Sequence, residues 1–314
     1  MDAPRIAVFG DLLYDCFIWA DRLPRVGETV TGYRNGFYAG GKGGNQAVAL
    51  SRLGALALML GKVGDDERGR FLLTKLRENG VDTKGVLIDP EAPTGTDCVH
   101  IDRQGRNAII VAPLANQRIA PDEVEGMRAA IEGADALISQ LQVNLDAVGK
   151  ALEIAHGAGV PIILNPAPAC EVPDRFFEIS DWVTPNETEA EFFTSVYREE
   201  LPLDEWCARV AEKFHARGVR RLIVTLGDKG AYCSDGRDAY LVPPFAVDAV
   251  DSTAAGDAFN AALAISLARG KGVREAIAYA NAAGALAASR PGSMPSLPSG
   301  DEVDGFLRAA SQPK

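Results

Sequence analysis

Short apolar runs alternate along the chain with longer amphipathic segments. The runs at 5–10 and 56–60 predict buried strands, whereas the spacing of apolar residues at 66–79 and 204–217 predicts helices. Strands and helices in turn predict a Rossmann-like three-layer α/β domain over residues 1–314, with a mostly parallel central sheet covered on both faces. Further strands are predicted at 86–88, 136–138, 160–164, 182–183, 221–225 and 245–250, and further helices at 45–53, 121–132, 145–156, from 184–191 onward and at 258–269.

Two segments, 11–39 and 94–113, do not follow this alternation. Both are rich in β-prone residues, are divided by turns and partly alternate between polar and apolar positions, and residues 102–106 are typical of a hairpin turn. They predict a small β-sheet appended to the main domain, where it would serve as a lid. The chain after Leu297 is expected to be weakly structured.

Composition narrows the class of protein. The net charge of −11 argues against a nucleic-acid binder, which needs a basic field. No run approaches the roughly twenty apolar residues of a membrane span, and the start of the chain shows no signal-peptide pattern. The five cysteines form no C-x-x-C pair and the three histidines lack zinc-ligand spacing. We therefore expect a cytoplasmic protein with free or buried thiols.

The stretch 251–260 combines an anion site with an acid. Ala254, Ala255 and Gly256 precede a helical run, and the free N–H groups of a helix's first turn bind anions. Asp257 follows directly, where a carboxylate would repel an anion but could accept a proton from a hydroxyl that attacks a phosphoryl group. The alternative is an early helix residue favoured by the helix dipole. On this stretch alone the two interpretations are equally good.

Two further motifs suit phosphate or sugar chemistry. The glycine-rich segment 40–47 contains Lys42 and leads into a helix, so that backbone and cation can both approach a ligand, although a flexible turn is the alternative. Asn186 and Glu189 lie one helical turn apart, an arrangement that suits a hydrated Mg²⁺. Considered alone, that pair is better explained as an ordinary helix start. Asn186 and Glu189 are expected near the carboxyl end of a strand, where open α/β sheets bind ligands.

The order of these motifs resembles the ribokinase (PfkB) family of carbohydrate kinases. The matching segments are 40–47, 165–169, 184–191, 225–230 and 251–260, and the resemblance runs from about residue 5 to residue 307. Segments 24–30 and 64–69 are similar to the ribokinases within that family. The resemblance implies a ribokinase-like fold and ATP-dependent phosphorylation of the primary hydroxyl of a sugar, ribose or a related pentose.

The resemblance also implies roles for individual residues. Asp257 would be the catalytic base, and Ala254, Ala255 and Gly256 would form the anion hole. The implied sugar contacts are Asp15, Gly41, Lys42, Asn45, Gln142 and Asp251. The implied nucleotide contacts are Asn186, Thr225, Gly227, Asp228, Gly230 and Asn281, with Glu189 in the Mg²⁺ region. A K⁺ site would involve Asp251, Thr253, Ala287, Arg290, Gly292 and Ser296.

Two departures from the ribokinase pattern leave the acceptor sugar open. Leu13 stands where ribokinases have Asn, and Gln142 stands where they have Glu. One hydrogen-bonding group is therefore lost, and one anionic hydrogen-bond acceptor is replaced by a neutral amide. A ketohexose or nucleoside kinase of the same family is therefore an alternative. Tyr14, Phe17 and Trp19 would either enlarge an apolar wall for such a substrate or form the core of the small sheet.

An alternative of another class is a sugar-binding regulator without turnover. The pair Gly256–Asp257 argues against it, because a sensor has no use for a base. The expected partners are thus a small-molecule sugar and ATP, with no nucleic acid and no membrane. The open edge of the small sheet and the resemblance to ribokinase together predict a homodimer formed through the lids.

Overall fold

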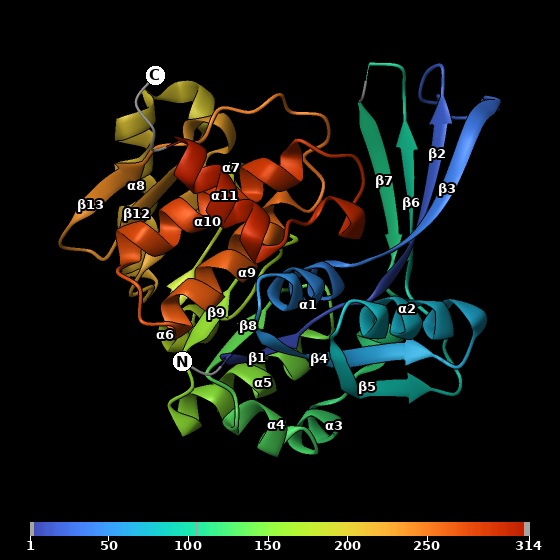
Figure 1. Cartoon of the computed structure of the whole chain (residues 1–314), viewed down its shortest axis with the longest axis horizontal. Helices are drawn as coiled ribbons and strands as arrows, with labels where there is room; N and C mark the ends of the chain where they lie inside the picture. Colours follow the sequence, from blue (N-terminus) through green and yellow to red (C-terminus); the bar gives the residue numbers. More distant parts are fainter. Residues whose placement is uncertain (1–2, 105, 311–314) are drawn as a thin grey trace.

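A nine-stranded sheet forms the centre of the molecule (Figure 1). The computed structural model describes residues 3–104 and 106–310. Neighbouring strands from β5 to β11 run parallel, and the last two strands are antiparallel additions. In spatial order the strands are β13 (Ala239–Val242), β12 (Ala231–Ser234), β11 (Leu222–Thr225), β10 (Trp182–Val183), β9 (Ile162–Leu164), β8 (Ala136–Ser139), β1 (Arg5–Phe9), β4 (Leu56–Gly64) and β5 (Asp82–Asp89).

Helices cover both faces of this sheet and divide the core into two apolar clusters. The cluster on one face is built with α1 (Lys42–Arg52), α2 (Glu67–Glu78), α9 (Ala255–Ala268), α10 (Val273–Ala288) and α11 (Gly300–Ala310). The other is built with α3 (Pro121–Glu125), α4 (Arg128–Glu132), α5 (Leu145–Ala158), α6 (Arg175–Ile179), α7 (Glu187–Thr194) and α8 (Leu203–Ala216). Short 3-10 turns are η1 (Leu114–Arg118), η2 (Arg198–Glu200), η3 (Gly227–Lys229) and η4 (Met294–Ser296). The predicted three-layer α/β class is confirmed.

A separate four-stranded sheet stands beside the main body (Figure 1). Its strands, in spatial order, are β3 (Gly32–Gly40), β2 (Leu13–Ala20), β6 (Thr96–Ile101) and β7 (Asn107–Ala112). The outer pairs are antiparallel hairpins, whereas β2 and β6 pair in parallel because they come from two distant segments. The strands fall in the two β-rich segments found in the sequence, and β3 extends one residue beyond the first of them.

The segment 245–250 is not a strand, and this prediction is wrong. Pro243 and Pro244 follow β13 and have no N–H to donate, so the ladder cannot continue through them. The chain instead crosses to α10, where the amides of Val250 and Asp251 both donate to the carbonyl of Ala288, over 2.8 and 3.1 Å. The stretch 251–260 is therefore a loop-to-helix junction.

Three helix predictions also need correction. The segment after Leu297 contains α11, because Val303, Phe306 and Leu307 recur at helical spacing and pack on the core. The helix predicted at 121–132 is two short helices interrupted at Gly126, a residue that favours helix poorly. Helix α1 begins three residues before the predicted position, at Lys42.

In the described part of the chain, none of the helices combines the length and apolar character required to cross a bilayer. All five cysteines are free thiols.

One polar cluster fixes the point where the small sheet joins the body. The Asp66 carboxylate caps α2 by accepting from the Gly69 amide over 2.7 Å. It also accepts from the hydroxyl and the amide of Thr94, over 2.6 and 2.8 Å. The Thr94 hydroxyl in turn accepts from the Gly64 amide at the end of β4, over 3.0 Å. Thr94 lies two residues before β6, so the cluster ties α2 and β4 to the root of that strand.

Thr94→Val tests this junction. The substitution keeps the side chain's shape but leaves the Gly64 amide and one Asp66 oxygen without the hydroxyl that they contact. Because Thr94 is fully buried, the free energy of unfolding should fall by about 1–3 kcal/mol in urea denaturation. Thr74→Val is the control, since its hydroxyl bonds only a carbonyl on the exposed side of α2. Equal stability of the two variants would contradict the role given to Thr94.

Candidate active site

The first turn of α9 places Asp257 against the start of α1. Asp257 is buried, and its two oxygens accept hydrogen bonds of 3.0 Å each from the side-chain amides of Asn45 and Gln46. Asn45 and Gln46 belong to the glycine-rich motif, so the two motifs singled out in the sequence meet at this carboxylate. Both donors leave the carboxylate's charge in place and fix its orientation.

The glycines of α1 permit this contact. A Cβ on Gly43 would lie 2.7 Å from the Asp11 carbonyl oxygen, and one on Gly41 would lie 2.8 Å from the Leu13 amide nitrogen. Gly41 also has φ +84°, a conformation that favours glycine. The chain after β1 therefore packs directly on the backbone of α1. The Asp11 side chain completes the contact by accepting from the Gly43 amide over 2.9 Å.

Residues at the carboxyl ends of three strands extend the network around Asp257. Gln46 donates to the side-chain oxygen of Asn165, after β9, over 3.2 Å and accepts from Gln140, after β8. Thr184, after β10, donates to the Asn260 side chain of α9 over 2.6 Å. The buried polar residues thus gather where open α/β sheets bind ligands.

Burial raises the pKa of Asp257, while the Lys42 ammonium and the two amide donors oppose the rise. Burial also raises the pKa of Asp11, against the Gly43 amide bond and the Lys42 charge. A carboxylate whose pKa is raised by burial and that is held by fixed donors is suited to accept a proton. Lys42 itself is partly exposed and provides the positive charge beside both acids.

The residue before α9 has an unusual backbone. Ala254 has φ +60°, a left-handed conformation that is uncommon for a residue with a side chain. Gly256 lies in the first turn of the helix and is exposed, and a Cβ added to it would meet nothing within 4 Å. Ala254, Ala255 and Gly256 therefore turn the chain sharply at an open helix N-terminus, next to Asp257.

Asp15 reaches the site from the small sheet. It lies on β2, is 4% exposed and accepts from the Ser293 hydroxyl over 3.3 Å. A Cβ on Gly40, at the end of β3, would lie 1.9 Å from a carboxylate oxygen of Asp15. The Asp15 carboxylate therefore lies against the end of β3, two residues before Lys42.

Asn186 and Glu189 form a capping box at the start of α7. Glu189 accepts from the amide and side chain of Asn186 over 2.9 and 3.0 Å, and Asn186 accepts from the Glu189 amide over 2.8 Å. This is the helix-start arrangement weighed in the sequence. Burial raises the pKa of Glu189, and its charge interacts with those of Lys42 and Asp257, so it borders the same site.

Most of the other residues assigned to the nucleotide lie together on a second surface, namely Thr225, Gly227, Gly230 and Asn281. Thr225 ends β11 and pairs with Asn186 in an isolated bridge. Gly227 begins η3, and Gly230 has φ +90° and packs so closely that a Cβ would lie 2.2 Å from the Val242 oxygen. Asn281 of α10 donates to the carbonyl of Pro243, beside Val242, over 3.0 Å. Asp228 extends into solvent, with a side chain that is 92% exposed.

The residues assigned to K⁺ come from two segments that lie together, the loop before α9 and the chain from the end of α10 to η4. Asp251 accepts from the Thr253 amide and hydroxyl with one oxygen, over 2.9 and 2.6 Å, and from the Gly292 amide with the other, over 2.9 Å. The Ala287 carbonyl accepts from the Arg290 amide, and the Ser296 hydroxyl donates to Ser293. Among residues 3–104 and 106–310 no cluster of acidic, histidine or cysteine side chains suits a metal ion. Any K⁺ here would depend on backbone carbonyls.

Some buried polar residues of this site were not among the residues assigned from the sequence. Gln140 is fully buried and joins the network through Gln46. Gln142, assigned to the sugar, is half-buried and accepts from the Gln117 side chain with its backbone carbonyl, so its side-chain role stays a prediction. Gln140 directly follows the apolar run of β8, and this position at a strand end was the only feature of the sequence that could have identified it as a site residue. Asp11 and Gln46 were missed although both lie within or beside motifs that were recognised.

The aromatic residues of β2 pack against one another and against rings of β3 and α2. Tyr14 packs against Phe37 and Phe71, with ring centroids 5.7 and 5.4 Å apart, and Phe17 packs against Trp19 over 5.7 Å. Phe17 is 3% exposed. Phe17 also lies on the same face of β2 as Asp15, so both roles considered for these residues stay predictions.

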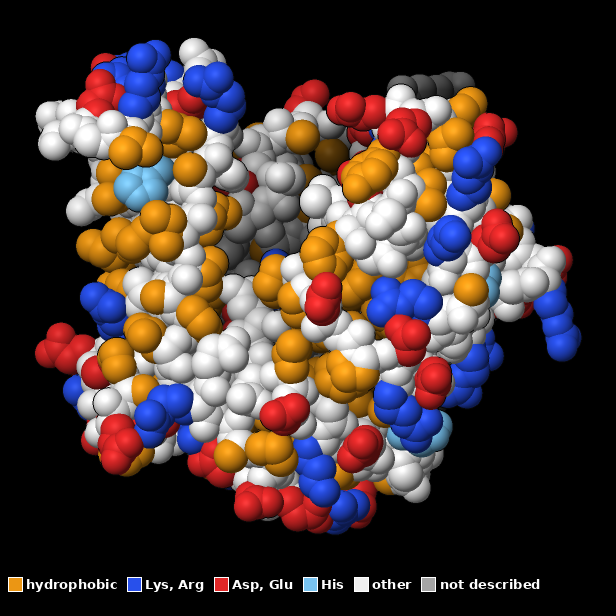
Figure 2. All heavy atoms as spheres, turned by 180° about the vertical axis from the view of Figure 1, so that it is seen from behind, with side chains coloured by type: hydrophobic (Ala, Val, Ile, Leu, Met, Phe, Trp, Pro, Cys, Tyr) orange, Lys and Arg blue, Asp and Glu red, His pale blue; other side chains and the backbone are white. Residues whose placement is uncertain are grey.

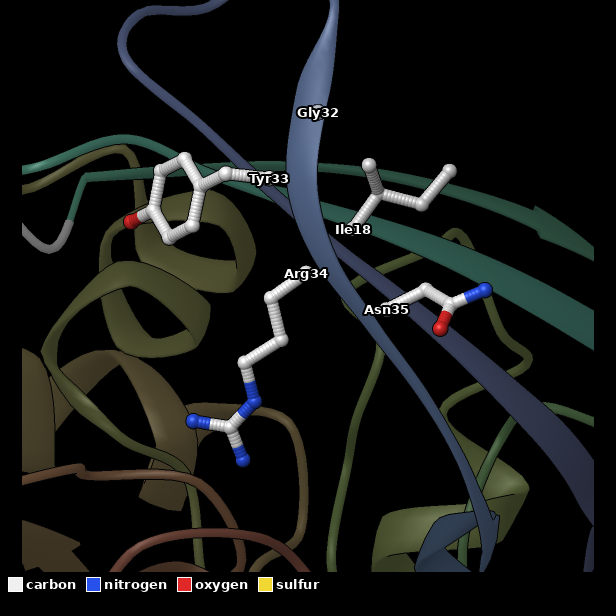
Figure 3. A pocket seen from close by; sticks show the side chains of 5 residues that line it. All are labelled: Ile18, Gly32, Tyr33, Arg34 and Asn35. Atoms are coloured by element: carbon white, nitrogen blue, oxygen red, sulfur yellow. The ribbon is translucent and has the colours of Figure 1, made fainter.

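Two hollows adjoin the small sheet. Figure 2 shows one between the sheet, at the left of that view, and the main body. The other, of about 420 Å³, is open and lies at the far end of the sheet, lined by Ile18 and 32–35. Figure 3 shows the Tyr33 ring and the Arg34 guanidinium on one side of β3 and Asn35 on the other. No residue assigned to the site lines this second hollow.

Comparison with known proteins identifies the family of this chain. Residues 3–300 match the model of the pfkB family of carbohydrate kinases. The chain is 37% identical over 303 residues to ribokinase of Bacillus subtilis and 34% identical over 305 residues to ribokinase of Haemophilus influenzae. The alignments cover 96% and 97% of this chain and 99% of each relative. A structure of Arabidopsis thaliana ribokinase complexed with ribose and ATP superimposes with a TM-score of 0.88 at 29% identity, over 98% of this chain and 99% of that one. The expectation of an ATP-dependent carbohydrate kinase is confirmed, and the chain belongs to the pfkB family of carbohydrate kinases.

Proposed function

We propose that the protein transfers the γ-phosphoryl group of ATP to the primary hydroxyl of ribose or a related pentose, with Asp257 as general base. The observation that carries the proposal is the buried Asp257 carboxylate, held by Asn45 and Gln46 at the open N-terminus of α9. The names of the relatives support the substrate, since those at 34% and 37% identity are ribokinases.

The geometry suggests how each group contributes. Asp257 takes the proton from the hydroxyl as the new O–P bond forms and the bond to the departing ADP breaks. The amides at Ala254, Ala255 and Gly256 stabilise the charge on the transferring group. Lys42 and Asp15 hold the acceptor, because they approach it from the main body and from the small sheet. We also propose that this sheet, over 11–39 and 94–113, is a lid that excludes water.

The metal and nucleotide parts rest on the chemistry of the donors. Mg²⁺ keeps several waters and binds through few carboxylates and the substrate's phosphates, where it neutralises phosphoryl charge. Glu189 fits such a contact through water, because both of its oxygens already accept hydrogen bonds from Asn186. The surface around Thr225, Gly230 and Asn281 is the proposed nucleotide site, and the bridge between Asn186 and Thr225 joins it to the phosphate region.

Asp257→Asn tests the function. The amide keeps the shape of the side chain but cannot accept the proton, so kcat for ribose should fall by about 10²–10⁴-fold. Ribose binding should remain measurable by calorimetry, because the sugar contacts are unchanged. Turnover is followed by a coupled assay of ADP release on pentoses, ketohexoses and nucleosides.

Asp304→Asn is the control, since this exposed residue of α11 also loses one negative charge. It should leave kcat unchanged. A full rate in Asp257→Asn would overturn the role of the base. Turnover of a nucleoside or ketohexose, with none of ribose, would reassign the substrate. Sugar binding without turnover of any acceptor by the unchanged protein would favour a regulator.

We propose further that K⁺ binds between the loops that carry Asp251 and Gly292. The hydrogen bond between these two residues and the bonds from Val250 and Asp251 to Ala288 hold the loops together beside the N-terminus of α9. A cation bound there would orient carbonyls and so steady the amides of the anion hole.

Exchange of K⁺ for Na⁺ at constant ionic strength tests this site. The rate at saturating ribose and ATP should fall several-fold in Na⁺, because the smaller ion fits the same carbonyls poorly. Gly292→Ala, at φ +89°, should weaken the dependence on K⁺. Equal rates in K⁺, Na⁺ and a large organic cation would exclude the proposal.

We also propose a homodimer formed through the lids. On the outer face of the small sheet, Phe37, Cys16, Cys98 and Ile110 lie in one row across the four strands. Phe37 is 51% exposed and Ile110 71% exposed, and every residue of the edge strand β7 is exposed. An open apolar edge of this kind is normally covered, and a second copy of the same sheet offers a matching surface.

Ile110→Lys tests the dimer. A charge in the apolar row should shift the protein toward monomer in sedimentation equilibrium, with the dissociation constant raised at least about 10-fold. Leu56→Lys is the control, because Leu56 is 60% exposed but begins a strand of the main sheet. A monomer for the unchanged protein at all concentrations, or an equal shift in both variants, would contradict the proposal.

A further inference from the structure

A second carboxylate lies opposite Asp15 on the small sheet. The parallel register of β2 and β6 pairs Asp15 directly with Asp97. Directly opposite residues of neighbouring strands point to the same face, so both carboxyl groups are on the side of the sheet that carries Asp15 toward Ser293 and Gly40. The two groups are close enough to share a hydrogen bond when one of them holds a proton.

The inward oxygens of this pair have no donor. One oxygen of Asp15 and one of Asp97 are buried and lack any hydrogen-bond partner among the described residues. Asp15 as a whole is only 4% exposed. Buried acceptors are normally satisfied, and an ionised carboxylate in particular requires donors. These two carboxylate oxygens lack hydrogen-bond donors and lie at the proposed binding site of the sugar. They point to a ligand that brings two hydrogen-bond donors of its own.

The same charged groups surround this pair and the proposed base, Asp257. Asp11, after β1, and Lys42, on α1, both interact electrostatically with Asp97. Opposite Asp97 on β7 stands Val111, which has no charge, and opposite Asp15 on β3 stands Tyr38. Asp11 and Lys42 also interact with Asp257, so the carboxyl pair and the proposed base are influenced by the same two charges.

We propose that Asp97 is a specificity-determining residue, which together with Asp15 binds two neighbouring hydroxyl groups of the acceptor. Each hydroxyl donates one hydrogen bond to one unmet oxygen, so the pair selects acceptors that carry a vicinal diol. The inference deepens the proposed function, because it names the feature by which the sugar would be recognised.

The pair also makes binding depend on pH. Burial, followed by the negative charge of Asp11, raises the pKa of Asp97 to about 6. Burial and the charge of Asp97 raise the pKa of Asp15 as well. Below pH 6 one proton lies between the two carboxyl groups and occupies the oxygens that the diol requires. Binding of the diol must then release that proton, so the affinity should fall as the pH falls through this range.

The test compares ribose with 2-deoxyribose, whose furanose ring lacks a vicinal diol. Binding of each sugar is measured by calorimetry, and kcat/KM by the coupled assay. In Asp97→Ala the affinity for ribose should fall about 10–100-fold, as expected for hydrogen bonds to a charged group. The affinity for 2-deoxyribose should change less than about threefold. The preference for ribose should therefore largely disappear.

Two further variants keep the test decisive. Asp97→Asn preserves volume and covers the case in which the alanine variant folds poorly. It should lose the preference and also the pH dependence of ribose binding near pH 6. Asp21→Asn is the matched control, because Asp21 lies on the same sheet's outer loop in an exposed ion pair with Arg103. This variant should retain the preference and the pH dependence of the unchanged protein.

Several results would overturn the inference. The first is that the unchanged protein shows no preference for ribose, and the second is that Asp97→Ala loses affinity equally for both sugars. The third is tighter binding of 2-amino-2-deoxyribose than of ribose, which would indicate recognition of an ammonium group. Because the readout is binding, it is independent of Asp257. A loss of preference in Asp97→Ala supports the inference even if Asp257→Asn keeps its turnover. If Asp97→Ala keeps the preference while Asp257→Asn loses its turnover, the inference is rejected and the proposed function stands.

Discussion

The contact between α1 and α9 determines the architecture of this site. Asn45 and Gln46 of α1 donate to the two oxygens of Asp257 on α9, although the residues are more than 200 positions apart in the chain. The contact requires α1 to begin directly on the backbone after β1, and this is possible only because Gly43 has no side chain. A single methyl group there would displace the helix and with it both donors. The glycine-rich motif therefore has a role in helix packing.

The two faces of the small sheet differ in chemistry. Asp15 and Asp97 occupy its inner face, whereas the outer face is apolar and exposed at Phe37 and Ile110. Alternation along the strands allows one element to serve two purposes. The junction at Asp66 and Thr94 fixes β6 to the main body, so the position of Asp97 depends on a hydrogen-bonded cluster outside the site.

Burial of several acids around a single lysine gives the site its electrostatic character. Asp11, Asp15, Asp257 and Glu189 all have raised pKa values, and loss of solvent is the first cause in each case. Fixed amide donors and the Lys42 charge oppose this effect at Asp257, whereas the negative charges of Asp97 and Asp11 add to it at Asp15. The acids are thereby divided between a held carboxylate suited to accept a proton and a pair in which one oxygen of each carboxylate lacks a donor.

The sequence by itself determined the layered class, most of the elements and the motifs that meet at Asp257, because periodicity, helix caps and glycine-rich turns are local properties. It failed where distant packing decides the outcome. The segment 245–250 is apolar enough for a strand, but Pro243 and Pro244 remove the ladder and α10 supplies another partner. The same limit hid Gln140 and Asp97, which carry no local signature. Only the tertiary structure sets Asp97 opposite Asp15, because strand register joins residues about eighty positions apart and cannot be derived from either segment alone.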